Sequence, residues 1–390
     1  MKSKYIDSTL TQMSELGAEQ MQLFQPKTLL MVVRSGILRR TLPIAILRQP
    51  STVNQDIKTI SFFVDDICEF VYFYLLAQEE VIRMKYAKSG TTVESINFEE
   101  LKDISIPFPP IAEQCRIVAA IESAFAVIDE IERNKTDLQA AIATAKQKIL
   151  SLAIRGKLVP QNPNDEPASV LLERIRAEQE QLIREEKIKR GKDDSTTIKS
   201  DDNSYYKELP ESWGVVSLAE ITNPSVLNDG DWILSDNMVT YGSVKLIQLG
   251  SIGYMEYVNK GFKYLSSKMF KKLNCTAIHT GYLLVNRLLG DKLNVCLLPD
   301  IDGMLITTVD TCCIAPHENY NLRFLMYTIA SESFQKTVTL KSAGSTRKRI
   351  SKGNLIQVPF AFPPLAEQHR IVSAIEAAFY QLDRVTALLA

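Results

Sequence analysis

FPPIAEQCRIVAAIESAFAVID, from Phe108 to Asp129, decides the fold of this chain, and it occurs twice: Phe362 to Asp383 reads FPPLAEQHRIVSAIEAAFYQLD. The two copies lie 254 residues apart. A repeat of this length is too well preserved to be accidental. Each copy passes from Pro-Pro into a stretch without glycine or proline, which in the first copy lasts until Gly156. Both copies therefore predict the start of a long helix.

The first copy continues as a heptad repeat. Its apolar seams are Ile117, Ala124, Ile131, Leu138, Ala145 and Leu152, and Ile121, Ile128, Ile142 and Ile149, with Lys135 inside the second seam. Such 4-3 spacing is typical of a coiled-coil helix, here about 60 Å long at about 1.5 Å per residue. The second copy repeats the seam, and each helix needs a partner for its apolar stripe. The two are expected to pair through Ile117, Ile121, Ile128, Ile142, Ile371, Ile375 and Leu382.

Two globular regions alternate with these helices. Residues 1–110 and 209–364 contain short strand-like runs with aromatic residues and glycines, such as GYLLVNRLL and MLITTVDTCCIA. The remaining parts are a central helical region at 111–190, a polar linker without periodicity at 191–208, and a distal helix at 365–390. The sequence therefore predicts an α+β fold in which two globular domains are separated by long helices.

The repeat also enters the globular regions. Gly90, Thr92, Ile96 and Leu101 fall 254 residues before Gly344, Thr346, Ile350 and Leu355. Upstream of the helix that precedes this second group, no comparable match is found at the same offset. The sequence therefore predicts two globular regions with a related scaffold but different exposed side chains.

Composition sets limits on the class of protein. Hydrophobic residues make up 45% of the chain and charged residues 23%, as in globular proteins. No apolar run approaches the length of a membrane span, and the first residues have no apolar core of a signal peptide. The six cysteines show no C-x-x-C spacing, and the three histidines are scattered, so no metal site is predicted. A cytoplasmic protein with reduced thiols is expected.

Catalytic motifs are not found in the sequence. It has no phosphate-binding G-x-x-x-x-G-K-[ST] loop, no dinucleotide-binding glycine fingerprint, and no grouping of serine, cysteine and histidine that suggests a triad. Asp56-x-Lys58 and Glu185-x-Lys187 each match half of a nuclease motif, which arises often by chance. We therefore expect no catalytic residues and no bound cofactor.

Basic residues with polar neighbours remain as candidates. KSAGSTRKRISKGN places cations beside small hydroxyl residues, a composition that suits phosphate oxygens and guanine edges; its candidate contacts are Lys341, Ser345, Thr346, Arg347, Lys348 and Arg349. A solvated basic loop is the alternative. With a net charge of −1, nucleic-acid binding must depend on such local patches. Weaker candidates of the same kind are Arg34, Arg39, Arg40, Lys263 and Lys268.

Three stretches together resemble one known family. PPLAEQ-x-RIV, ILSLAIRGKLVPQNPNDEPASVLLERIRAEQEQLI and LPESWGVVSLAEI look like the specificity subunit of Type I restriction–modification systems, over most of the chain. NQDIKTI and GSTRKRISKGNL also resemble parts of that family's recognition domains. The resemblance implies target-recognition domains at 1–110 and 209–364, and conserved helices that pair as an antiparallel coiled coil and dock modification subunits.

The resemblance also implies how the work is divided among subunits. This chain binds double-stranded DNA and catalyses nothing, while modification subunits use S-adenosylmethionine and restriction subunits use ATP and Mg. Two unlike recognition domains imply a bipartite, asymmetric target around an unread spacer. Compared with the family pattern, the first domain is expected to lack its opening segment and the distal helix its continuation.

A second class of function stays open from the sequence. A coiled-coil scaffold with two protein-binding domains and no DNA role has the same helices. The basic stretch at 341–352 favours the DNA-binding class.

Overall fold

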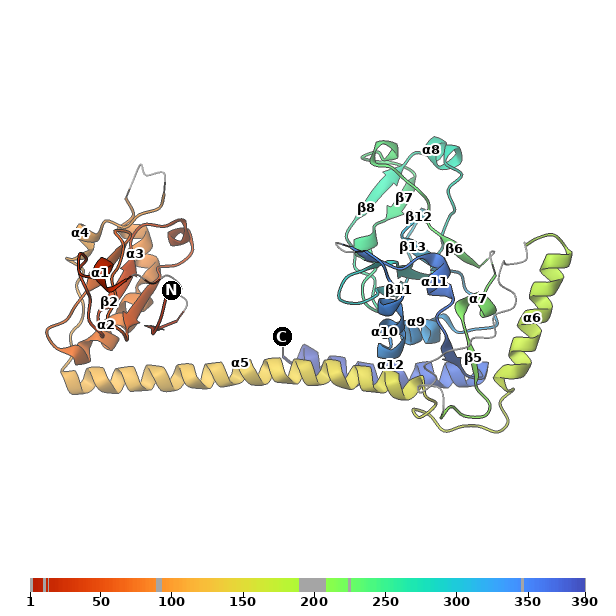
Figure 1. Ribbon diagram of the computed structural model, residues 1–390, viewed down its shortest axis with the longest axis horizontal. Coiled ribbons are helices and arrows are strands. Elements are labelled where there is room, and N and C mark those ends of the chain that lie inside the picture. Colours follow the sequence, from red (N-terminus) through yellow and green to blue (C-terminus); the bar gives the residue numbers. More distant parts are fainter. Residues whose placement is uncertain are drawn as a thin grey trace. The chain divides into compact units, whose positions relative to one another are not determined.

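The computed structural model describes residues 3–9, 12, 14–88, 93–188, 208–223, 226–344 and 347–389 (Figure 1). The chain forms two compact units, Met1–Lys135 and Thr136–Ala390. Helix α5 (Ile111–Ala153) begins in the first unit and ends in the second. The predicted α+β fold with two domains and long helices is confirmed. No helix in the described ranges combines the length and the apolar character that crossing a membrane requires.

The first unit is a four-stranded sheet covered by helices. Its strands are β1 (Tyr5–Ile6), β2 (Leu29–Val32), β3 (Ile44–Leu47) and β4 (Ile57–Ile60), in the order β1-β3-β2-β4. Its helices are α1 (Glu15–Ala18), η1 (Gly36–Arg39), η2 (Asp65–Ile67), α2 (Cys68–Ala77), α3 (Glu79–Lys85) and α4 (Phe98–Leu101). The buried faces of β2 and β3 and one side of α2 form its core, onto which Val118 of α5 packs.

The second unit contains a larger and a smaller sheet. The larger has the order β11-β9-β13-β6, and its strands are β6 (Leu227–Asp229), β9 (Leu283–Asn286), β11 (Val295–Leu297) and β13 (Thr311–Ile314). The smaller has the order β12-β7-β8, with β7 (Val244–Ile247), β8 (Phe262–Leu265) and β12 (Met304–Thr307). Two-stranded pairs join β5 (Gly214–Val216) to β15 (Phe360–Phe362), and β10 (Leu288–Leu289) to β14 (Lys348–Arg349).

Helices surround the larger sheet of the second unit. They are α6 (Ala168–Arg184), α7 (Leu218–Ile221), α9 (Leu322–Ala330), α10 (Glu332–Leu340), α11 (Lys352–Ile356) and α12 (Leu365–Ala387), while η4 (Ser235–Asn237), η5 (Leu249–Ser251) and α8 (Ser267–Lys272) flank the smaller sheet. One core contains the sheet, α9 and α12 together with the end of α5. The larger sheet of the second unit and the helix pair are therefore built on a single hydrophobic core.

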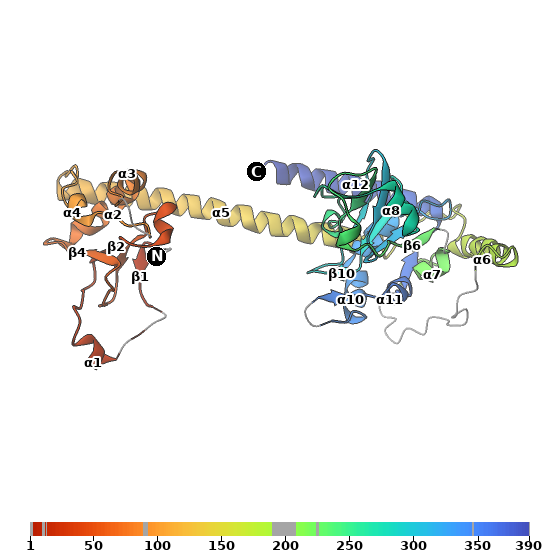
Figure 2. The same ribbon diagram turned by 90° about the horizontal axis from the view of Figure 1, so that it is seen from above.

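The end of α5 and α12 run antiparallel (Figures 1 and 2). Lys146 Nζ lies 2.5 Å from Asp383 Oδ1 and 5.2 Å from the centre of the Phe379 ring. One turn further along α5, Leu150 shares a core with Ile371 and Ile375, nearer the start of α12. Ile142 is also buried, and Leu382 is half-buried. Helix α5 closes at Gly156, whose φ of +68° suits glycine.

The predicted pairing is wrong for three side chains of the first unit. Ile117 and Ile121 pack against the core of that unit, and Ile128 is 47% exposed. Heptad spacing shows that a helix has an apolar stripe, but it does not show which element covers each part of the stripe. The first turns of α5 are covered by their own globular unit.

The repeat extends further in the structure than was found in the sequence. Strands β2 and β9, strands β4 and β13, and helices α2 and α9 begin 254 residues apart, as α5 and α12 do. Backbone hydrogen bonds repeat as well: Val33 N donates to Asp56 O, and Arg287 N donates to Asp310 O, both at 2.8 Å. The expectation of no match upstream is therefore corrected. TLLMVVRSG and YLLVNRLLG preserve two leucines and a glycine at this offset.

A buried carboxylate connects α12 to two other segments of the second unit, one that follows α5 and one that precedes β5. Glu367 is 1% exposed, and its two oxygens accept hydrogen bonds from Trp213 Nε1 at 2.9 Å and Gln161 Nε2 at 2.6 Å. Burial raises the pKa of Glu367 above 4.5, although both donors act in the opposite direction. Its ionised form is thus held in place by two donors but disfavoured by desolvation.

This carboxylate predicts a pH dependence of stability. With a raised pKa in the folded state, the folded chain binds more protons than the unfolded chain between 4.5 and that pKa. The free energy of unfolding contributed by Glu367 is therefore highest below 4.5 and falls as pH rises through the folded pKa. In Glu367→Gln this pH-dependent contribution to the free energy of unfolding should be absent, because glutamine does not titrate. Urea unfolding of both proteins across this pH range, followed by circular dichroism, measures it; parallel curves would contradict the assignment.

Candidate nucleic-acid interface

A short basic arm, residues 341–349, follows α10 in the second unit. Ala343 and Arg349 close it through two backbone hydrogen bonds of 3.0 and 2.8 Å, and β14 pairs with β10. Gly344 has a φ of +116°, and a Cβ there would lie 2.4 Å from the carbonyl oxygen of Arg347. Glycine is therefore required at this position.

The cations of the basic arm have different surroundings. Lys341, Arg347 and Lys348 are exposed. Arg349 has its Nη2 2.7 Å from Asp310 Oδ1 and is 45% exposed. One side of its guanidinium is thus held by a carboxylate while the rest faces solvent. Two further predicted contacts, Ser345 and Thr346, lie outside the described residues.

A buried arginine anchors the basic arm. Arg287, 4% exposed, accepts a hydrogen bond from Ile350 N at 3.0 Å through its backbone carbonyl. Its Nη2 lies 3.5 Å from Asp229 Oδ1 and donates to the carbonyl oxygen of Val309. The backbone N–H of Arg287 also donates to the carbonyl oxygen of Asp310, the ion-pair partner of Arg349. Arg287 therefore connects the basic arm to the turn that carries Asp310. Sequence reasoning missed this residue, for which the one signal is an arginine within an apolar run.

The other predicted cations are exposed as well: Arg34, Arg39, Arg40, Lys263 and Lys268. Lys263 lies in β8 of the smaller sheet and Lys268 lies in α8, which flanks that sheet, so neither belongs to the basic arm. Arg39 Nε is 2.7 Å from a carboxylate oxygen of Glu94. Within the second unit, Lys263 and Lys268 therefore belong to other elements than the basic arm, and Arg34, Arg39 and Arg40 belong to the first unit.

The first unit has different side chains at the positions equivalent to the cations of the basic arm. At the positions of the three consecutive cations of the second unit, it has Val93, Glu94 and Ser95. The backbone framework is preserved, because Ile96 N donates to Val33 O at 2.8 Å as Ile350 N donates to Arg287 O. Two copies of one framework thus present unlike side chains.

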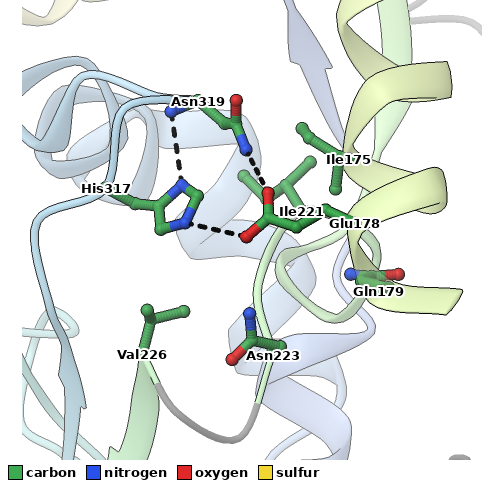
Figure 3. A pocket seen from close by; sticks show the side chains of 8 residues that line it. All are labelled: Ile175, Glu178, Gln179, Ile221, Asn223, Val226, His317 and Asn319. Carbon is green, nitrogen blue, oxygen red and sulfur yellow. Dashed lines mark hydrogen bonds and ion pairs between the residues drawn. The ribbon is translucent and has the colours of Figure 1, made fainter. Parts of the chain in front are cut away.

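A small pocket lies between α6 and the second unit's sheet (Figure 3). Glu178 Oε1 is 3.3 Å from His317 Nε2, and Glu178 Oε2 accepts a hydrogen bond from Asn319 Nδ2 at 3.0 Å. Ile221 and Val226 complete its apolar wall. The polar groups contact one another across the space, so the pocket fastens α6 to the unit instead of offering a catalytic group.

The described residues were also searched for other chemistry. Within those ranges, no three His, Cys, Asp or Glu side chains gather where they could hold a metal ion. Burial raises the pKa of the Cys312 thiol to about 12 and that of Cys275 to about 11. These two thiols are weak nucleophiles at neutral pH.

Comparison with known proteins places this geometry in a family. The family profile described as the Type I restriction modification DNA specificity domain matches residues 13–139 and 210–388. The EcoEI specificity subunit of Escherichia coli is 29% identical over 340 residues, 73% of this chain and 55% of the relative. The EcoAI specificity subunit of the same organism is 30% identical over 245 residues, 61% of this chain and 39% of the relative. The chain thus spans about half the length of these curated relatives or less.

A solved structure supports the fold. A chain from work described as "Structural basis underlying complex assembly and conformational transition of the type I R-M system" has a TM-score of 0.58 and 16% identity. The match covers 94% of this chain and 78% of that chain. At this identity the likeness concerns the fold alone.

Proposed function

This chain belongs to the family of Type I restriction modification DNA specificity domains, and we propose that it is the cytoplasmic DNA-recognition subunit of such a complex. It reads a bipartite, asymmetric target with two unlike recognition domains, docks modification subunits, and catalyses no reaction itself. Modification subunits supply S-adenosylmethionine chemistry, and restriction subunits supply ATP- and Mg-dependent chemistry.

The basic arm is the observation that carries this proposal. Three consecutive cations lie at and directly before β14, and the next residue, Ile350, donates its N–H to the backbone carbonyl of the buried Arg287. A rigid base lowers the entropy lost when side chains are fixed on a ligand. Phosphate oxygens and guanine edges are the acceptors that such cations recognise in double-stranded DNA. A protein-binding scaffold does not account for this clustering.

The residues at equivalent positions of the two units support an asymmetric target. The basic arm carries Arg347, Lys348 and Arg349, whereas the equivalent positions of the first unit are apolar, acidic and hydroxyl side chains. Two copies of a framework with the same side chains suit a symmetric site, whereas unlike side chains suit two unlike half-sites.

Different cations of the basic arm should act differently on DNA. Arg347 is exposed and suits a phosphate, whereas Asp310 orients Arg349 for a base edge. We expect Arg347→Ala to weaken binding to all sequences and to reduce the salt slope by about 1. Arg349→Ala should cost about 1–3 kcal/mol and relax one position of the target. Selection of binding sites from random duplexes by the complex with modification subunits, followed by a salt series, measures both.

The matched control is Lys336→Ala, a cation on the exposed face of α10 that pairs with Glu332 at 2.8 Å. It should change neither the selected sequence nor the salt slope. If DNA affinity, salt slope and sequence preference are unchanged in both arm variants, the basic arm is a solvated loop that does not contact DNA.

A further inference from the structure

Both units have an arginine at the same place in their framework, but the two arginines come from opposite segments. In the second unit β10 pairs antiparallel with β14, so that Leu288 lies opposite Arg349. The residues at these positions of the repeat in the first unit are Arg34 and Ser95, and they also lie opposite each other in an antiparallel bridge. We call the two opposite residues the cross-strand pair. Its arginine lies on the earlier segment of the chain in the first unit and on the later segment in the second.

The backbone beside the cross-strand pair is the same in both units. In the first unit Ile96 N donates to Val33 O at 2.8 Å. In the second unit Ile350 N donates to Arg287 O at 3.0 Å. These bonds join the residue before the earlier member of each pair to the residue after the later member. The two cross-strand pairs therefore have the same register and are equivalent positions of one framework.

The geometry of the cross-strand pair lets an arginine serve from either segment. Side chains that lie opposite each other in an antiparallel pairing are on the same face, with their Cβ atoms about 4.5–5.5 Å apart. The long methylene stem of an arginine can span such a distance. Arg34 is exposed, and the side chain of Arg349 is 45% exposed. Both guanidinium groups can therefore reach a ligand on the same face of the framework.

A second cation of the first unit lies beside its cross-strand pair. The counterpart of Lys348 in the first unit is Glu94, whose Oε1 accepts a hydrogen bond from Arg39 Nε at 2.7 Å. Arg39 ends η1, and Arg83 Nη1 donates to the carbonyl oxygens of Leu38 and Arg39 at 3.4 and 3.0 Å. The carboxylate thus replaces the cation of the second unit and holds another that comes from η1. Each unit brings two cations to this place.

We propose that Arg34 is a specificity-determining residue of the first unit, which reads a base edge of double-stranded DNA from the place that Arg349 occupies in the second unit. This inference rests on the proposed function and deepens it. A guanidinium fork recognises O6 and N7 of guanine through two hydrogen bonds. Because Arg34 comes from the opposite segment of the pair, its fork meets the bases from a different position. The same framework therefore reads two unlike half-sites.

The test moves the arginine across the cross-strand pair. The complex with modification subunits selects binding sites from random duplexes, and its affinity for the selected target is then measured. Arg34→Leu should lower this affinity about tenfold and relax one position of the target, in the half-site that Arg349→Ala leaves unchanged. Arg34→Lys preserves the charge but not the fork, so it should relax the same position with a smaller loss of affinity.

A second substitution should reverse the loss. Adding Ser95→Arg to Arg34→Leu gives the first unit the same cross-strand pair as the second. The aspartate that holds Arg349, Asp310, has Asp56 as its counterpart, so a carboxylate is present at the equivalent position. Most of the lost affinity should return, because the new guanidinium reaches the same face of the framework.

The matched control is Arg48→Leu, which should change neither affinity nor selection. Arg48 is an exposed arginine of the same unit that lies 3.8 Å from the centre of the Tyr5 ring. It follows β3 at the opposite end of the pairing with β2 from Arg34.

Two outcomes overturn the inference. One is an Arg34→Leu complex with the affinity and selection of the wild type, and the other is a loss that Ser95→Arg does not reduce. In either case an effect of Arg349→Ala on the other half-site leaves the proposed function intact. If Arg34→Leu and Arg349→Ala both leave selection unchanged, the proposed role of this framework in DNA recognition fails as well.

Discussion

Ile375→Ala is expected to destabilise the second unit by about 2–5 kcal/mol. Ile375 lies in α12, is fully buried, and packs in the core that joins the end of α5 to the sheet. Truncation removes its apolar burial and leaves a cavity in a close-packed core. Both tryptophans, Trp213 and Trp232, belong to the second unit, so intrinsic fluorescence during urea unfolding reports the stability of that unit.

The matched control for this substitution is Ile128→Ala. Ile128 has the same chemistry and a seam position of the same repeat, but it is 47% exposed. Ile128 belongs to the first unit, which has no tryptophan, so the stability of that unit is followed by far-UV circular dichroism during urea unfolding. The substitution should change that stability by no more than about 0.5 kcal/mol. If Ile128→Ala destabilises the first unit as much as Ile375→Ala destabilises the second, the division of the helix stripe between covered and uncovered parts is wrong.

Arg287→Met should cost the second unit about 3 kcal/mol. Methionine preserves much of the apolar stem but removes the cation beside Asp229 and the donor to Val309 O. Breaking a buried ion pair by removing one partner typically costs about 3–5 kcal/mol, because the other charge is left uncompensated. Asp229 retains 31% side-chain exposure, which places the cost at the lower end.

A double-mutant cycle with Asp229→Asn tests the physical reason. If the cost comes from an uncompensated carboxylate, Arg287→Met should cost less in the Asp229→Asn background. DNA affinity should fall in Arg287→Met because residue 287, whose backbone carbonyl accepts the bond from Ile350 N, loses the side-chain contacts with Asp229 and Val309 that hold it in place. An Arg287→Met protein with unchanged stability and DNA affinity would show that the arm does not depend on this anchor.

Much of the candidate site could be predicted from residue types, but its connections could not. Three consecutive cations after Gly-Ser-Thr indicate a basic surface segment from the sequence alone. Asp310 and Arg287 meet the arm only because β9 pairs with β13 and β10 pairs with β14, and strand order depends on contacts far apart in the sequence. The different surroundings of Arg347 and Arg349 follow from these strand pairings.

The sequence by itself determined the repeat, the α+β class and the helix stripes, because apolar periodicity and proline placement act locally along the chain. Only the tertiary structure decided which element covers each stripe: a globular core at Ile117, α12 beside Lys146, and solvent at Ile128. It also decided that Phe362 is covered and Phe108 is not, although their local sequences are nearly identical. Burial is a property of what packs against a side chain, and that partner is specified elsewhere in the chain.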